Sequence, residues 1–174
     1  TAFFFHQVHY SEIKGWEHLQ FVSLLPLYTA GGVLAMLVSG WALDKFGTPR
    51  LIPFYQLPLS LAFILFAQTS DVSLLLIGIL FFAVTAGANV TLPNAFWAEF
   101  YGTENLGALK ALAAGLMVLG SAIGPGITGI LIDLGVPLDR QYLWVSGFFV
   151  LCSILVYIGI SRSKSALHIM PLLR

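Results

Sequence analysis

The sequence has few charged residues and a single cysteine, and each shortage excludes a class of protein. Charged residues make up 9% of the 174 residues and hydrophobic residues 58%, whereas soluble domains have about 25% charged and about 45–50% apolar residues. A chain with so few polar side chains cannot coat a water-soluble globule, but a bilayer needs no polar coat on surfaces that face lipid. The composition therefore predicts an integral membrane protein.

The net charge and the cysteine count exclude further classes. Eight basic and eight acidic residues cancel, so there is no electrostatic basis for binding nucleic acid. Cys152 is the only cysteine and lies in the mostly apolar run 148–156, so it cannot form an intrachain disulfide and we interpret it as a packing residue. The chain opens on Thr1 with no signal peptide and no initiator Met, which predicts a fragment.

Six apolar segments predict membrane-spanning helices, at residues 1–10, 19–43, 51–67, 72–98, 106–132 and 142–160. A spanning helix needs roughly 20 mostly apolar residues, which five of the segments reach or approach, and the first looks truncated at its start. Their length and lack of alternating polarity exclude the strands of a membrane barrel. Because the turns are only a few residues long, we expect consecutive helices to be antiparallel neighbours.

Basic residues are divided unevenly between the two membrane faces that these segments define. The turns that stay in the cytoplasm during insertion are the ones enriched in Lys and Arg. One face carries Lys45, Arg50, Lys110, Arg162, Lys164 and Arg174. The other face carries only Lys14 and Arg140. We therefore predict a cytoplasmic C-terminus.

Neutral polar residues are the candidates for contacting a solute, because all sixteen charged residues (eight basic plus eight acidic) fall in turns, helix ends or the tail. Ionisable groups within a bilayer usually mark ion pathways, so their absence shifts that role to neutral groups and His. Residues 85–94 combine hydrogen-bonding side chains with Pro93, which bends a helix and suits either a cavity wall or polar contacts between helices. The cavity candidates are His6, Gln7, His9, Tyr28, Asn89, Thr91 and Asn94.

The two histidines near the start are a weak metal site. His6 and His9 share one helical face, but no Cys accompanies them and acids occur only in the following loop, so we predict no metal and no cofactor. Hydrogen bonding or protonation at a cavity mouth, or ordinary contacts between helices, remain as roles. No His-Glu-x-x-His motif, Gly-x-Ser-x-Gly motif or pair of intramembrane aspartates is present, so we predict no catalytic residue and no enzyme.

The turn between the second and third segments resembles the signature motif of the major facilitator superfamily. Gly40, three residues, Asp44, Lys45, one residue and Gly47 follow that motif, although Thr48 and Pro49 replace basic residues that are frequent in the family. The resemblance implies a cytoplasmic gate that forms in one access state, made of Gly40, Asp44, Lys45, Gly47, Arg50 and Glu99. Physically, Gly40 admits a neighbouring helix, Gly47 permits a tight turn and the basic residues can pair with Glu99. The alternative is a charged turn that only fixes topology.

Glycines in the fifth segment predict close helix packing with a bend, at Gly120, Gly124, Pro125 and Gly129. The stretch is similar to part of the antiporter signature of the same superfamily, but Ala111 and Thr128 replace other glycines, so we do not predict antiport. The second segment ends in Gly-x-x-x-Asp-x-x-Gly and the fifth in Gly-x-x-x-Asp-x-Gly, on opposite faces. This similarity supports two inverted three-helix repeats.

Residues 97–107 are similar to a loop of bacterial facilitators akin to monocarboxylate porters, and the resemblance covers almost the whole chain. It implies an all-α, polytopic transmembrane helix bundle that is half of a major facilitator fold, built as a 3+3 inverted repeat with its first helix truncated. The C-terminal half is favoured. Residues 1–161 would form the six-helix half-bundle and residues 162–174 a cytoplasmic tail.

The resemblance also implies a function. The chain would belong to a secondary transporter in the plasma membrane, the inner membrane of a bacterium, moving a small solute by alternating access. An organic anion is one candidate solute, with or without a coupling ion. The expected partners are the lipid bilayer, the solute and an absent N-terminal half, and no nucleic acid. A non-transporting receptor or scaffold subunit and, less favoured, a membrane-embedded enzyme are the alternative functions.

Overall fold

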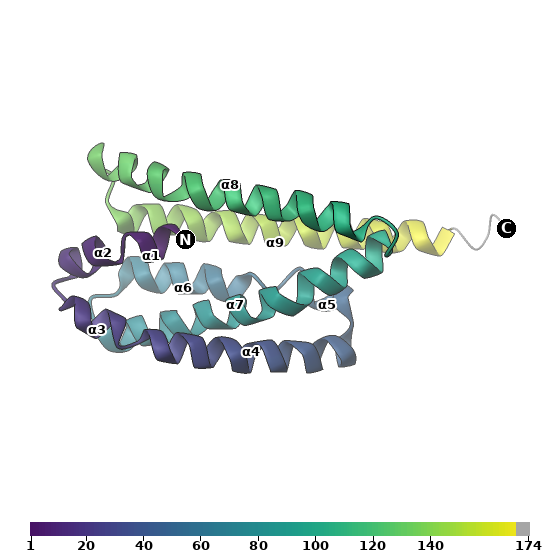
Figure 1. The fold of residues 1–174 in the computed structure, drawn as a ribbon, viewed down its shortest axis with the longest axis horizontal. Helices are drawn as coiled ribbons and strands as arrows, with labels where there is room; N and C mark the ends of the chain where they lie inside the picture. Colours follow the sequence, from purple (N-terminus) through teal and green to yellow (C-terminus); the bar gives the residue numbers. More distant parts are fainter. Residues whose placement is uncertain (170–174) are drawn as a thin grey trace.

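The computed structural model describes residues 1–169, and side chains as far as residue 162. Within these residues the chain forms helices and turns and no strand. The helices are α1 (Ala2–Phe5), α2 (Gln7–Lys14), α3 (His18–Val22), α4 (Leu25–Phe46), α5 (Thr48–Leu51), α6 (Leu57–Gln68), α7 (Val72–Tyr101), α8 (Leu106–Asp133) and α9 (Leu138–Ile169) (Figure 1). Residues 170–174 of the predicted tail, including Arg174, and the side chain of Lys164 lie outside the described part.

The helices run along the long axis of the molecule, in alternating directions between two ends (Figure 1). We call one end the basic end; it holds the turns at Gly47 and Gly102 and the last part of α9. The opposite end holds the turns at Gly15, Ser70 and Gly135. Long apolar runs produce this arrangement because a helix satisfies all of its backbone hydrogen bonds internally.

Four of the described helical stretches are long and apolar enough to cross a membrane: His18–Phe46, Val72–Tyr101, Leu106–Asp133 and Leu138–Arg162. Each has 25 residues or more, so each exceeds the roughly 20 needed for a span. The predicted all-α transmembrane bundle is confirmed.

The third predicted segment is not one continuous helix, which corrects the expectation for residues 51–67. Helix α5 ends at Leu51 and α6 begins at Leu57, with turns between them. Pro53 and Pro58 lack the N–H that would continue the helical ladder, and each ring clashes with the carbonyl four residues earlier. The break therefore lies at the prolines, and α6 alone has 12 residues.

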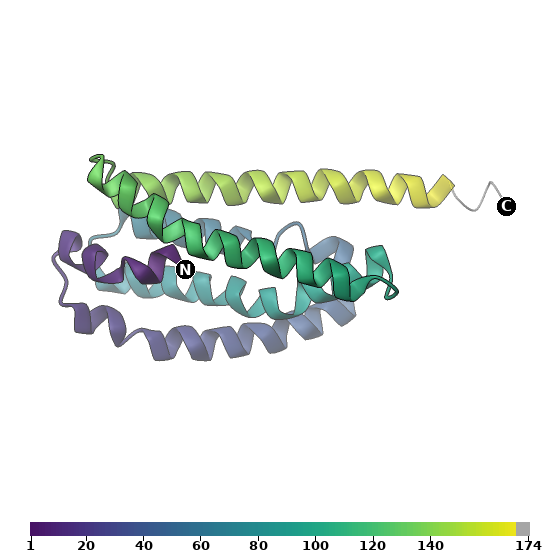
Figure 2. The ribbon, with the colours of Figure 1, turned by 45° about the horizontal axis from the view of Figure 1, so that its top comes forward.

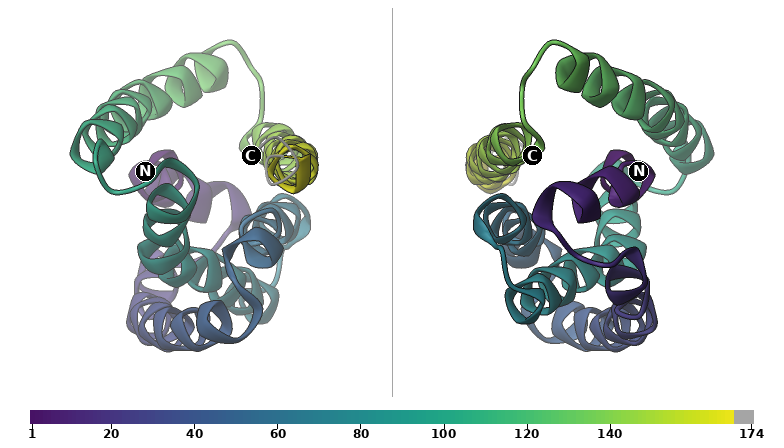
Figure 3. Two further views of the ribbon diagram at one scale, coloured as in Figure 1. Left: turned by 90° about the vertical axis from the view of Figure 1, so that its right-hand side faces the viewer. Right: turned by 90° about the vertical axis from the view of Figure 1, so that its left-hand side faces the viewer.

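The most extensive helix contacts do not all join neighbours along the chain. Helix α7 packs along α4 and α6, and α6 packs along α9. Consecutive long helices alternate in direction as expected, but α8 packs only sparsely on its neighbours α7 and α9, whereas α4 and α7, which run in the same direction, pack extensively (Figure 1). Helices α8 and α4 lie on opposite sides of the bundle, with α7 between them (Figure 3).

Two separate apolar clusters hold the helices together. The larger is rich in aromatic rings and joins α1, α2, α3, α6, α7 and the start of α9, with Phe3, Phe66 and Tyr142 at its centre. Phe3 stacks on Phe66 at a centroid distance of 4.4 Å. The smaller cluster joins Ile52, Ala88, Leu92 and Ile160 nearer the basic end. The polar contacts described next lie along the same helices.

Candidate functional site

The predicted gate turn lies at the basic end, where α4 ends and α5 begins. Gly47 has a φ of 76°, a left-handed conformation that side chains other than Gly rarely adopt. Asp44, Lys45 and Arg50 are all exposed, and the Lys45 ammonium lies 5.0 Å from the ring centroid of Trp41. The structure therefore displays the turn at the surface of this end.

The ion pairs that the sequence suggested at this turn are not formed. Among residues 1–162 the structure contains no salt bridge from Lys45 or Arg50 to Glu99. A Cβ placed on Gly40 would have no heavy atom within 4 Å outside its own helix. In this conformation, therefore, no other helix within the described part of the chain closely approaches Gly40.

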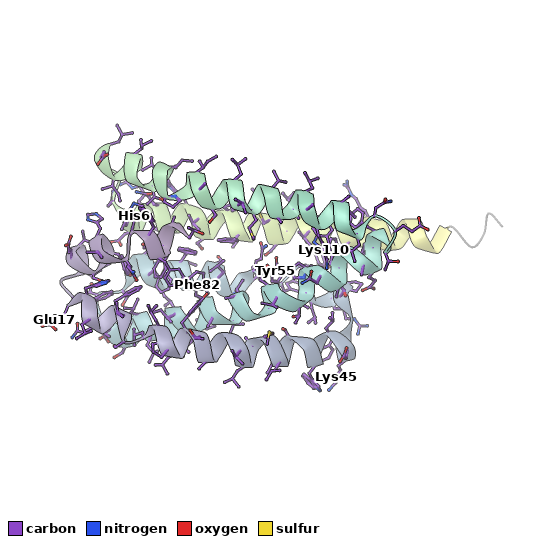
Figure 4. All side chains as sticks on the ribbon, viewed as in Figure 1. His6, Glu17, Lys45, Tyr55, Phe82 and Lys110 are labelled. Atoms are coloured by element: carbon purple, nitrogen blue, oxygen red, sulfur yellow. The ribbon has the colours of Figure 1, made fainter. Side chains whose placement is uncertain are left out.

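The cavity candidates at the start of the chain lie beside α8 and the aromatic cluster. His6 interrupts the helix between α1 and α2, and its Nδ1 lies 3.1 Å from the carbonyl oxygen of Ala2. Its Nε2 lies 3.7 Å from the position of a Cβ on Gly129, so the ring faces α8 (Figure 4). Tyr28 packs instead into the aromatic cluster, 5.6 Å from the ring centroid of Phe82. Gln7 has a buried Oε1 without a hydrogen-bond partner among the described groups.

Two of the three candidates on α7 have hydrogen-bond partners within the described helices. The Thr91 hydroxyl lies 2.7 Å from the hydroxyl of Ser39 and so joins α7 to α4. Asn94 Nδ2 donates to the carbonyl oxygen of Val90 at 2.7 Å within its own helix. The contact between Thr91 and Ser39 is of the kind that holds membrane helices together, whereas the Asn94 bond is local to α7.

The third candidate, Asn89, takes part in a polar cluster at the break in the third segment. Gln56 Nε2 donates to the Tyr55 hydroxyl at 3.0 Å, and that hydroxyl donates to Asn89 Oδ1 at 3.4 Å. The hydroxyl of Thr85 donates to the carbonyl oxygen of Tyr55 at 3.2 Å. This carbonyl lies in the interrupted backbone between α5 and α6, so Thr85 supplies a hydrogen bond there.

His9 lines a polar hollow at the opposite end, of about 510 Å³, together with Lys14, Ser70 and Asp139. Lys14 Nζ lies 2.9 Å from Asp139 Oδ1 and 3.4 Å from the carbonyl oxygen of Ala67. The Lys14 side chain is only 10% exposed and that of Asp139 is 43% exposed. This ion pair ties α2 to the first turn of α9.

The glycine-rich helix α8 meets α1 along part of its length. The hydroxyls of Thr1 and Ser121 lie 2.5 Å apart, and a Cβ on Gly124 would lie 3.9 Å from that of Ala2. A Cβ on Gly120 would meet nothing within 4 Å. Figure 2 shows α8 crossing in front of the bundle with α1 directly beneath it. Thus this edge of the small-residue stretch contacts α1 at Ser121 and Gly124, whereas Gly120 lines an open hollow beside Thr1 and Ala2 without close contact.

The predicted site residues therefore fall into several groups rather than one. Sequence reasoning named Asn89 as a candidate but missed Tyr55, which contacts it, because an aromatic residue in an apolar run signals packing. It also missed the Lys14–Asp139 pair. The available signal was that both charges lie at helix ends on the same predicted membrane face.

The family model for the Major Facilitator Superfamily matches residues 1–168. The chain belongs to the major facilitator superfamily. No curated protein and no solved structure matches it. As a major facilitator chain it is a multi-pass membrane protein of a transporter family, and its long apolar helices are the membrane-spanning elements. The matched residues include the gate turn, the polar cluster at the break in the third segment and the glycines of α8.

Proposed function

We propose that this chain is the C-terminal six-helix half of a secondary transporter that moves a small solute by alternating access, with an organic anion as the first candidate. The observation that carries the proposal is the family match over residues 1–168, together with helices that alternate in direction between two ends. The resemblance of residues 97–107 to monocarboxylate-porter-like facilitators supports the choice of anion. We place the basic end in the cytoplasm of a bacterial cell because it carries most of the basic residues.

The exposed apolar faces of α4 and α8 support the proposal that a second half of the transporter packs against this chain. No residue of either helix is buried within the described chain, although both carry large apolar side chains such as Leu34 and Met117, which are 63% and 65% exposed. These helices lie on opposite sides of the bundle (Figure 3). We propose that one face of each packs on the N-terminal half around a shared solute path, and that the remaining surface contacts lipid.

The gate turn has a conformational role in this proposal. In the structure its charges are exposed and unpaired with Glu99, which fits a state in which the gate is open. A closed state would bring Asp44 against a helix N-terminus, and such a contact stabilises a carboxylate. No observation on this chain favours the receptor or scaffold alternative.

Uptake by proteoliposomes that contain the full-length transporter tests the proposal. We expect uptake of radiolabelled monocarboxylates of two to four carbons, and loss of uptake in Asp44→Asn and Gly47→Leu variants that still insert. The matched control is Glu104→Gln, which removes an exposed carboxylate from another turn of the basic end. Full uptake by both gate variants would contradict the gate, and no uptake of any tested anion by the wild type would contradict the solute class.

A further inference from the structure

Tyr55 is attached to α7 at two points, and this fixes its position beside Asn89. Its backbone carbonyl accepts from the Thr85 hydroxyl and its own hydroxyl donates to Asn89 Oδ1. Thr85 and Asn89 are four residues apart, so they lie one above the other on the same helical face. Both bonds therefore orient the Tyr55 side chain along α7.

The direction of the hydrogen bonds determines which side of the Asn89 amide remains available. Gln56 Nε2 can only donate, so the Tyr55 oxygen accepts from it and the single hydroxyl hydrogen is left for Asn89 Oδ1. Among residues 1–162 the structure gives Asn89 Nδ2 no hydrogen-bond partner. Asn89 is also exposed. The amide therefore presents both of its N–H donors, whereas its oxygen already accepts one hydrogen bond.

The position of Asn89 on α7 places it on the inner side of the bundle. Phe82 lies seven residues earlier, about two helical turns, and therefore on the same face. The Phe82 ring lies 5.6 Å from that of Phe3 and 5.4 Å from that of Phe4, both on α1. Phe82 and Tyr55 both lie between the two ends of the bundle (Figure 4). Asn89 thus shares the α7 face that turns toward α1.

We propose that Gln56 and Tyr55 orient Asn89 so that its Nδ2 hydrogens donate to the transported solute, which makes Asn89 a specificity-determining position for solutes with acceptor oxygens. Carboxylates and ketones offer such oxygens, whereas ammonium groups offer only donors, which cannot pair with the N–H groups of this amide. Tyr55 and Gln56 are positioning residues, because they act through Asn89. The inference rests on the proposed transport function and adds a recognition rule to it.

Asn89→Asp is the sharpest test, because it replaces the donor NH2 with an acceptor oxygen at almost unchanged size. In proteoliposomes of the full-length transporter we expect kcat/KM for labelled two- to four-carbon monocarboxylates to fall by about tenfold or more, since a donated hydrogen bond to a charged group is lost and a repulsive charge is added. Asn105→Asp is the matched control. It makes the same change at an exposed residue in the turn before α8, outside the predicted cavity, and we expect its kcat/KM to stay close to that of the wild type.

Tyr55→Phe tests the positioning role without removing the ring. We expect KM for the same anions to rise about fivefold with kcat nearly unchanged, because Asn89 is still present but no longer held. In an Asn89→Ala background the same Tyr55→Phe change should have no further effect on KM. Additive effects of the two changes would overturn the positioning role.

The outcomes separate this inference from the proposed function. Uptake by the wild type with equal effects of Asn89→Asp and Asn105→Asp would overturn the inference and leave the transport function standing. No uptake of any tested anion by the wild type would overturn the proposed anion transport itself. Size-exclusion profiles in detergent identify variants that fail to fold. If Asn89→Asp fails to fold, the Tyr55→Phe variant still tests whether Tyr55 positions Asn89.

Discussion

Gly87 of α7 meets the backbone of α4 at Gly32 with no space for a side chain. A Cβ on Gly87 would collide with the carbonyl oxygen of Gly32 and would lie 2.7 Å from the backbone nitrogen of Met36. The reverse does not hold, because a Cβ on Gly32 would lie 3.8 Å from the carbonyl oxygen of Ala83, an ordinary contact. This close approach sets the spacing of the two helices that pack together most extensively.

Because only Gly87 lacks room for a side chain, a change from Gly to Ala should have opposite effects on stability at Gly87 and at Gly32. We expect Gly87→Ala to lower the free energy of unfolding by about 1–3 kcal/mol, because α4 and α7 must move apart. Gly32→Ala should change it by less than about 1 kcal/mol, with stabilisation favoured by the smaller backbone entropy loss. Thermal unfolding of both variants in the same detergent measures the difference. Equal stabilities would contradict the close packing of α4 on α7.

A second prediction concerns a buried hydroxyl pair between α6 and α9. Ser60 and Ser146 place their hydroxyl oxygens 2.7 Å apart, and both residues are buried. We expect each single change to Ala to cost roughly 0.5–1.5 kcal/mol, and the double change to cost less than the sum, because both single changes remove the same bond between the hydroxyls. Ser60 also donates to the carbonyl oxygen of Ser146 at 3.1 Å, and Ser146→Ala keeps this bond. A double-mutant cycle in detergent measures this coupling. Ser23→Ala is the control, since Ser23 is exposed and bonds only locally to Gln20; strict additivity of the pair would show that the contact is not maintained.

The helical class and the approximate spans could be predicted from the sequence, because a long apolar run bounded by turn residues satisfies its backbone hydrogen bonds in lipid by forming a helix. The break in the third segment was also visible in the sequence, as Pro53 and Pro58, but counting apolar residues gave a single span. The length and the hydropathy of a segment do not show that its prolines lack the N–H donor that a continuous helix needs. The prolines therefore mattered more than the composition of the segment.

The polar contacts could not be read in the same way, since they depend on which helices meet. Tyr55 and Asn89 are 34 residues apart and come together only because α7 packs along the third segment. Thr91 looked equally suited to a cavity wall, but it bonds Ser39 on α4. Local sequence gives the kind of side chain, whereas its partner is decided by helix rotation and packing.

The ion pair at the opposite end predicts unequal effects for its two members. Lys14 is nearly buried and Asp139 is partly exposed, so a partnerless Lys14 ammonium is harder to hydrate than a partnerless Asp139 carboxylate. We expect Asp139→Asn to cost about 2 kcal/mol of stability and Lys14→Met clearly less. Arg140→Met, at an exposed position of the same end, serves as the control. Thermal unfolding in detergent decides the order, and a larger loss in Lys14→Met would show that the ammonium is not the buried partner.

The broken third segment predicts a specific labelling pattern across the membrane. Helix α6 has 12 residues, which span only about 18 Å of a hydrocarbon layer about 30 Å thick. A full crossing therefore also requires α5 and the turns between α5 and α6. In a Cys152→Ser background, single cysteines at exposed Arg50 and exposed Ser70 lie on either side of this segment. An impermeant maleimide should label Arg50→Cys only in inside-out vesicles and Ser70→Cys only in right-side-out vesicles, with Glu104→Cys following Arg50→Cys. If Arg50→Cys and Ser70→Cys were labelled from the same face, α6 would enter and leave the membrane on one side, and the alternating order of the helices after it would be wrong.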